Sequence, residues 1–172
     1  MGVLKNLEKQ LEGVFKAAPK LPKDSKESLA KIWPILALVF GILQLLAAGL
    51  LWGLIGNINR YLDTANTISL YYIGAPTAYT AADKTWIYVG IAVLLVDAVI
   101  LLMAYPHLVK RARRGWDLLF IGSLVNVAYS IVSLFIADRG ISSFLFGLIG
   151  SAVGFYLLFQ VKPLYKGASL EK

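Results

Sequence analysis

The chain has 172 residues, of which 58% are hydrophobic and 16% are charged, and its mean hydropathy is +0.69. Soluble domains are about 45–50% apolar and about 25% charged, and a water-soluble fold of this size hides only about 70% of its surface. The composition therefore excludes an ordinary soluble domain and favours a single unit buried in lipid. The net charge is +7, and the lack of cysteine excludes a disulfide framework, a thiolate metal site and a catalytic thiol.

Residues 1–18 have a helical pattern. Lysines and glutamates fill one face, and apolar residues recur at helical spacing on the other, namely Val3, Leu4, Leu7, Leu11, Val14, Phe15 and Ala18. We expect an amphipathic interfacial helix in the plane of the inner membrane leaflet, and a contact helix for a partner protein is the alternative. Pro19 and Pro22 should end this helix and begin a linker over residues 19–31.

Four long apolar runs follow, at residues 32–56, 86–105, 118–137 and 141–161. Each has about 20 residues or more, enough for a helix to cross a hydrocarbon core about 30 Å thick. Because the bilayer offers no water to satisfy backbone groups, a continuous apolar run of this length predicts a helix. The sequence therefore predicts an all-α fold, an integral membrane four-helix bundle over residues 32–161 with a tail over 162–172.

The basic residues lie mostly on one side of the predicted spans. Of the 17 Lys and Arg residues, only Arg60, Lys84 and Arg139 fall in the two connections expected on the other side. The positive-inside rule then places both termini in the cytoplasm, N-in and C-in. We expect the inner membrane of a bacterium as the location of this multi-pass protein.

The two connections expected on the outer side differ in length. The first covers residues 57–85 and contains Gly74 and Pro76, which predict a turn. The second is the short stretch DRG at residues 138–140, which predicts a tight antiparallel hairpin between the last two spans.

Small residues recur along the predicted spans. Helices in lipid associate through close van der Waals contact, which small residues permit. The GxxxG pattern occurs at Gly49/Gly53 and at Gly150/Gly154, and Gly147 lies just before the second pair. These glycines are the predicted helix-packing positions, and the pattern leaves open whether the partner helix belongs to the same chain.

One carboxylate, Asp97, lies in the middle of the second apolar run, within VLLVDAVILLMAY. An ionised Asp at mid-membrane costs about 2.5–3.5 kcal/mol on insertion scales and needs a partner, water or a proton. We expect Asn126 as its first partner and Gln44 as the next. Two interpretations stay open: a hydrogen-bonded packing cluster with a protonated carboxyl, and a proton- or cation-coupled pathway completed by oligomerisation.

The turn between the second and third runs, KRARRGWD, holds four basic residues, Lys110, Arg111, Arg113 and Arg114. Between two spans this cluster favours anionic lipid headgroups over nucleic acid. His107 precedes it, and without a second His or any Cys a protein metal site is not expected. No catalytic triad, carboxylate pair or phosphate loop is recognisable, so we expect neither enzyme activity nor a cofactor.

The segments RRGWDLLFIGSLV and GSAVGFYLLFQVKPLY resemble the second half of small, uncharacterised four-helix membrane proteins of bacteria with reduced genomes. Some of those proteins carry a chromate-transporter label. The likeness covers about the last 65 residues, and its motif is a basic turn before GWDLLF together with a glycine-rich last helix. It implies an inner-membrane protein and assigns no role to a particular residue.

The small-residue stripes, the surface helix and the lack of catalytic motifs favour a non-enzymatic accessory or structural subunit of a membrane complex or homo-oligomer. The alternative is a small-solute or ion transporter with Asp97 as the coupling or coordinating group. The expected partners are a bilayer with anionic headgroups and other membrane subunits or a second copy, without nucleic acid.

Overall fold

A computed structural model describes residues 2–72, 81–133, 140–167 and 170, and these residues are almost entirely helical. The elements are α1 (Val3–Phe15), α2 (Lys23–Tyr72), α3 (Ala81–Val109), α4 (Arg113–Ser133), α5 (Gly140–Val161) and a 3-10 turn, η1 (Lys162–Leu164). Within these described ranges the strand-like pairing consists of one isolated bridge between Ala112 and Lys166. The prediction of an all-α fold is confirmed.

Among the described residues, four helices are long and apolar enough to cross a membrane, as the sequence predicts. Their candidate spans are Lys23–Asn57, Thr85–Val109, Arg113–Val132 and Gly147–Leu164. Between 17% and 33% of the residues in their most apolar windows are buried inside the molecule. Most residues of these windows are therefore not buried by the chain itself.

Helix α2 begins earlier than expected. The linker predicted over residues 19–31 is shorter, because the helix already starts at Lys23. The first residues of α2 are mostly Lys, Glu, Leu and Ala, which favour helix, and Asp24 in the first turn suits the positive end of the helix dipole. Pro34 lies inside α2 without ending it.

Helix α2 also continues well past its apolar part, into the connection predicted over residues 57–85. This stretch of mixed polarity contains no Gly or Pro before Gly74, so no residue type in it breaks a helix. The hydroxyls of Thr64 and Thr67 each donate to the backbone carbonyl one turn earlier, at 2.8 Å. The turn predicted at Gly74 and Pro76 lies outside the described residues.

The other boundaries differ by a few residues. Helix α1 ends at Phe15, before the predicted limit at residue 18, and α4 already begins at Arg113. The hairpin predicted at residues 138–140 falls outside the described part of the chain, apart from Gly140 at the start of α5.

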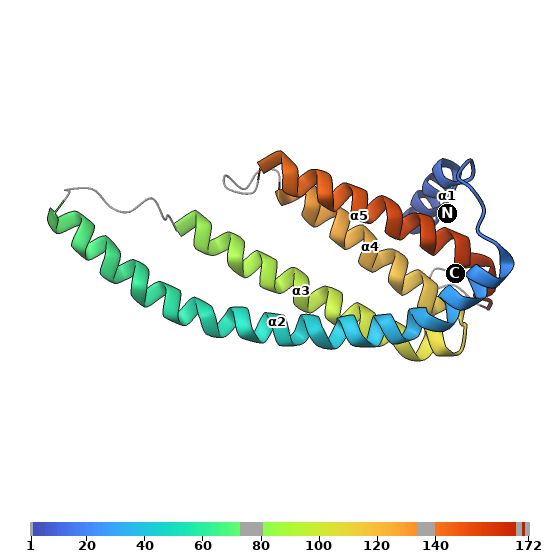
Figure 1. The fold of residues 1–172 in the computed structure, drawn as a ribbon, viewed down its shortest axis with the longest axis horizontal. Coiled ribbons are helices and arrows are strands. Elements are labelled where there is room, and N and C mark those ends of the chain that lie inside the picture. Colours follow the sequence, from blue (N-terminus) through green and yellow to red (C-terminus); the bar gives the residue numbers. More distant parts are fainter. Residues whose placement is uncertain (1, 73–80, 134–139, 168–169, 171–172) are drawn as a thin grey trace.

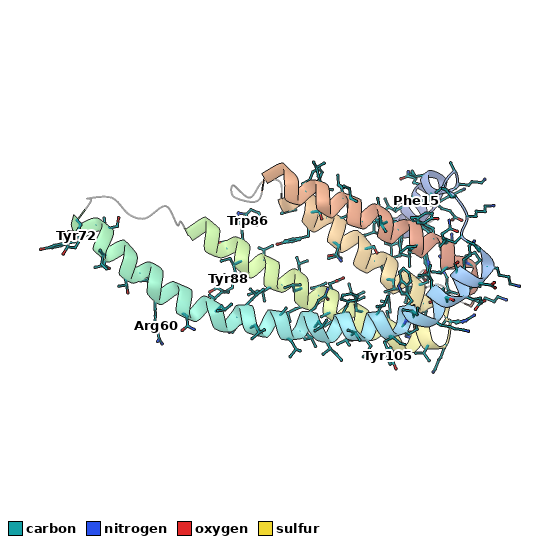
Figure 2. The ribbon with its side chains drawn as sticks, in the orientation of Figure 1. Phe15, Arg60, Tyr72, Trp86, Tyr88 and Tyr105 are labelled. Carbon is teal, nitrogen blue, oxygen red and sulfur yellow. The ribbon has the colours of Figure 1, made fainter. Side chains whose placement is uncertain are left out.

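The four long helices are arranged in sequence order. Helix α2 packs along α3, α3 along α4 and α4 along α5, whereas α2 and α5 have few contacts. Both termini, α1 and the α3–α4 turn lie at one end, the terminal end (Figure 1). Figure 2 shows Phe15 at this end and Tyr72 at the opposite tip, with Arg60 between them on α2. Toward that tip, α2 and α5 lie apart (Figure 1).

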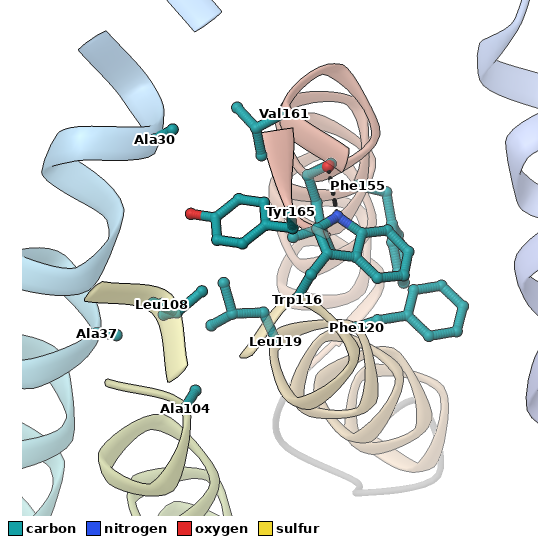
Figure 3. Packing of buried hydrophobic residues seen from close by; sticks show 11 residues of the cluster. Ala30, Ala37, Ala104, Leu108, Trp116, Leu119, Phe120, Phe155, Val161 and Tyr165 are labelled. Carbon is teal, nitrogen blue, oxygen red and sulfur yellow. Dashed lines mark hydrogen bonds between the residues drawn. The ribbon is translucent and has the colours of Figure 1, made fainter. Parts of the chain in front are cut away.

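The main core lies at the terminal end. Trp116 is fully buried, its ring stacks on Phe120 with centroids 5.4 Å apart, and its Nε1 donates to the carbonyl of Leu158 at 2.8 Å (Figure 3). Ala30 of α2 and Val161 of α5 belong to the same cluster, so α2 and α5 meet here. All four long helices are therefore joined at this end.

Helix α1 packs against this core with its apolar face. Leu11 and Phe15 contact the buried cluster, and the Phe15 ring lies 5.8 Å from Phe159 and 6.5 Å from Phe155 of α5. The amphipathic pattern is therefore real, and much of its apolar side covers the end of the bundle. Val3 and Val14 stay 74% and 69% exposed, which leaves apolar surface on α1 for other contacts.

Candidate functional site

The best-defined polar site within the spans surrounds Asp97 of α3. Asp97 is 5% exposed, although it lies in the apolar middle of its helix. Gln44 of α2 donates from Nε2 to Oδ2 of the carboxylate at 2.8 Å. On the other side, a Cβ built on Gly122 of α4 would lie 3.0 Å from Oδ1. Three helices thus meet at one carboxylate, and glycine at position 122 leaves room for it.

The expected order of partners is different in the structure. Asn126 donates from Nδ2 to the carbonyl of Gly122 at 3.0 Å, one turn back in its own helix. An amide that is satisfied in its own turn has less to gain from reaching a neighbouring helix. Gln44 has a longer side chain and comes from α2, which packs against α3, so it makes the interhelical hydrogen bond.

A cavity of about 410 Å³ opens beside this group, lined by residues of α2, α3 and α4. Its polar lining residues are Gln44, Asp97, Asn126 and Tyr129, and most of the others are aliphatic. The Oε1 atom of Gln44 is buried and has no hydrogen-bond partner among the described residues. A buried acceptor without a donor is costly, so Gln44 is held here at some expense in stability.

A second polar cluster joins α1 to the terminal end of the bundle. Arg113 donates to Glu8 at 2.5 Å and to Asp117 at 2.9 Å, and its guanidinium lies 4.1 Å from the centroid of the Trp116 ring. Lys162 pairs with Glu8 at 2.8 Å and also with Glu12. The pairs with Glu8 and Glu12 fix the position of α1 on α4 and η1.

The pKa of Glu8 reports this environment. Burial alone would raise it, but the hydrogen bonds from Lys162 and Arg113 and the charges of both residues outweigh burial, so the pKa lies below its usual value. Glu8 is therefore ionised at neutral pH and holds both basic groups.

Of the four predicted headgroup residues, two are paired with carboxylates and two are exposed. Arg113 is paired as described, and Arg111 pairs with Glu27 of α2 at 2.7 Å. Lys110 and Arg114 are exposed. In the sequence, only the basic residues in the turn were counted, and the acidic residues that α1 and α2 bring to it were not considered. Glu8 and Glu12 are four residues apart and form an acidic face on α1, which indicates a basic partner. Binding of lipid by this turn stays a prediction.

The five predicted packing glycines differ in how closely other atoms approach them. A Cβ built on Gly147 would meet Oγ of Ser130 at 2.7 Å, so α5 and α4 approach closely there. Cβ atoms built on the other four, Gly49, Gly53, Gly150 and Gly154, would meet nothing within 4 Å. The tightest contact to backbone is at Gly115, where a Cβ would lie 2.7 Å from the nitrogen of Leu108; the GxxxG pattern does not mark this position.

His107 lies in the last turn of α3 and is half-buried. Among the described residues, no group of three or more His, Cys, Asp or Glu side chains is placed to hold a metal ion. The expectation of no metal site is not tested further by this observation.

Comparison with known families, with curated proteins and with solved structures finds no match to this chain. The resemblance drawn from the GWDLLF segment and the last helix therefore stays a prediction, and function has to be argued from the geometry above.

Proposed function

We propose that the chain is a multi-pass integral membrane protein and a non-enzymatic accessory or structural subunit, which packs in the bilayer against other subunits or a second copy. Four helices are long and apolar enough to span a membrane, and large apolar side chains on them are exposed, such as Leu50 at 71%, Ile149 at 61% and Met103 at 57%. Burying such surface in lipid is favourable by about 25 cal/mol per Å².

The proposed orientation has both termini in the cytoplasm of a bacterium. The support is the charge asymmetry: the terminal end carries the basic turn, α1 and the C-terminal tail, whereas Arg60 lies on the far part of α2 (Figure 2). Basic residues next to short connections are retained on the cytoplasmic side.

The observation that carries the assembly role is the uncovered stretch of α5 at Gly150 and Gly154. Gly150, Gly154 and Val161 lie on one face of α5, because their spacings of four and seven residues are helical. Val161 is fully buried in the core that includes Ala30 of α2, whereas further along this face Gly154 and Gly150 would tolerate a Cβ without contact. A helix of another subunit fits such a face.

Disulfide cross-linking tests this interface, and the chain is suited to it because it has no cysteine. Gly150→Cys places a thiol on the open face, and Val96→Cys, on the exposed outer side of α3, is the matched control. Under mild oxidation in native membranes, Gly150→Cys should form a covalent dimer or a larger adduct and Val96→Cys should not. Equal cross-linking of both variants, or none together with a monomeric mass in detergent, would refute the assembly role.

A second candidate function is a small-solute or ion transporter with Asp97 as the coupling or coordinating group. The cavity beside Asp97 favours it, because Asp97, Gln44 and Asn126 line one chamber with polar side chains. The test is proton or monovalent-cation flux into proteoliposomes, read by a trapped pH dye or ion dye. Transport requires flux that Asp97→Asn abolishes while the oligomer persists; absence of flux in the unaltered protein excludes this candidate.

A further inference from the structure

A basic groove lies at the terminal end, between α1, the segment that follows it and the end of α5. Its volume is about 600 Å³, and four lysines line it: Lys9, Lys16, Lys20 and Lys26. Among the described residues of its lining, the one acidic residue is Glu12, which pairs with Lys162. Four lysines against one carboxylate, which is already paired with Lys162, leave the groove with a net positive charge.

The rest of the lining is largely apolar. Phe15 of α1 stacks on Phe159 of α5 with ring centroids 5.8 Å apart, and Ala18 and Pro163 continue this surface. Cations beside an aromatic and aliphatic surface suit a ligand that has an anionic group joined to an apolar part. A free polyanion would use the lysines alone.

The groove is held in shape by hydrogen bonds to the segment after α1. Gln160, which is 8% exposed, accepts from the backbone nitrogen of Leu21 at 3.2 Å and donates to the carbonyl of Pro19 at 3.1 Å. The hydroxyl of Tyr156 donates to the same carbonyl at 2.7 Å. Because this wall is already ordered, a ligand does not have to order it on binding.

We infer that this groove binds the headgroup of an anionic phospholipid, with the phosphate held by lysines and the glycerol and first acyl carbons against Phe15 and Phe159. The inference rests on the proposed location in a membrane, which would bring the terminal end to headgroup depth. Lys ammonium groups bind phosphate as compact charges with three donors each. In the predicted basic turn, by contrast, Arg111 and Arg113 are already paired with carboxylates.

The test compares two double variants of the full chain purified in mild detergent. Lys16→Gln with Lys20→Gln removes two groove cations, and Lys110→Gln with Arg114→Gln removes two exposed cations from the turn at the same end. Native mass spectrometry counts bound phosphatidylglycerol and phosphatidylcholine during a lipid titration. At about fivefold per basic residue, the groove variant should bind phosphatidylglycerol about 25-fold more weakly, and the turn variant should change it less than about threefold.

Three results would overturn the inference: equal losses in the two variants, equal binding of phosphatidylcholine by the unaltered protein, and displacement of phosphatidylglycerol by inorganic phosphate at similar concentration. The last result would identify a soluble anion as the ligand in place of a lipid. The cross-link at residue 150 is read separately, so failure of the groove with a persistent cross-link leaves the assembly role standing. Loss of that cross-link with intact lipid selectivity refutes the assembly role and leaves the groove as a lipid site.

Discussion

Gly115 offers the sharpest test of the packing at the terminal end. It lies in the first turn of α4 against the last turn of α3, and a Cβ built there would be 2.7 Å from the nitrogen of Leu108 and 2.9 Å from the carbonyl carbon of His107. Real Cβ atoms essentially never approach other atoms within 3.0 Å. Gly115→Ala therefore requires the backbone of one helix to move.

The backbone around Gly115 has little freedom to move. Ala112 donates to the carbonyl of His107 at 2.8 Å, and Arg113 donates to the carbonyl of Lys166 at 2.8 Å. Overpacking destabilises a protein by about 1–3 kcal/mol, and we expect a value in the upper half of this range because the clash is with backbone. Alanine returns up to about 1 kcal/mol of helix propensity, so the expected net loss is about 1–2 kcal/mol.

The assay is unfolding in detergent by titration with SDS, followed by tryptophan fluorescence and helical circular dichroism. Gly49→Ala is the matched control, because nothing lies within 4 Å of its added methyl, and it should be neutral or stabilising by up to about 1 kcal/mol. Gly115→Ala should shift the midpoint to lower SDS. An unchanged midpoint for Gly115→Ala, or the same shift in both variants, would refute the packing described here.

Three further predictions concern polar groups. Asp97→Asn should unfold at nearly the same SDS midpoint as the unaltered protein, whereas Asp97→Leu should lose about 1–3 kcal/mol because it leaves the partner amide of α2 unpaired; equal midpoints would contradict this. Trp116→Phe should lower the melting temperature in detergent, since a buried carbonyl of α5 loses its donor at a cost of about 1–2 kcal/mol, and no change would contradict it. Because the pKa of Glu8 is lowered in the folded protein, its stabilisation of α1 docking is complete above the unfolded value near 4.5 and is lost as the pH falls through the lower folded value. A spin label at Asn6→Cys should become mobile in that range, and Glu8→Gln should make it mobile already at pH 7; a label insensitive to both changes would refute this role.

The candidate spans could be predicted from the sequence because they are recognised by the length and hydropathy of a continuous run, and neither depends on tertiary packing. The extension of α2 was missed for the opposite reason: beyond Asn57 polar and apolar residues alternate without a continuous apolar run, although Gly and Pro are absent there until Gly74. A helix needs compatible residues more than apolar ones when nothing buries it.

Only part of the candidate site could be predicted from the sequence. A lone carboxylate in an apolar run identified Asp97 as buried and hydrogen-bonded, but its choice of Gln44 over Asn126 depends on which side chains are satisfied within their own helix. The pairing of Arg113 with Glu8 joins residues 105 positions apart in the sequence. Such contacts depend on where α1 docks, and the acidic face of α1 alone does not specify that position.

The most direct test of the proposed membrane topology is labelling of single cysteines by a membrane-impermeant maleimide in intact bacteria that express the protein. Thr64→Cys lies on the polar extension of α2, and Lys110→Cys lies in the exposed turn at the terminal end. The account predicts that Thr64→Cys reacts in intact cells and that Lys110→Cys reacts only after lysis. Reaction of Lys110→Cys in intact cells, or recovery of the chain in the soluble fraction without detergent, would contradict it.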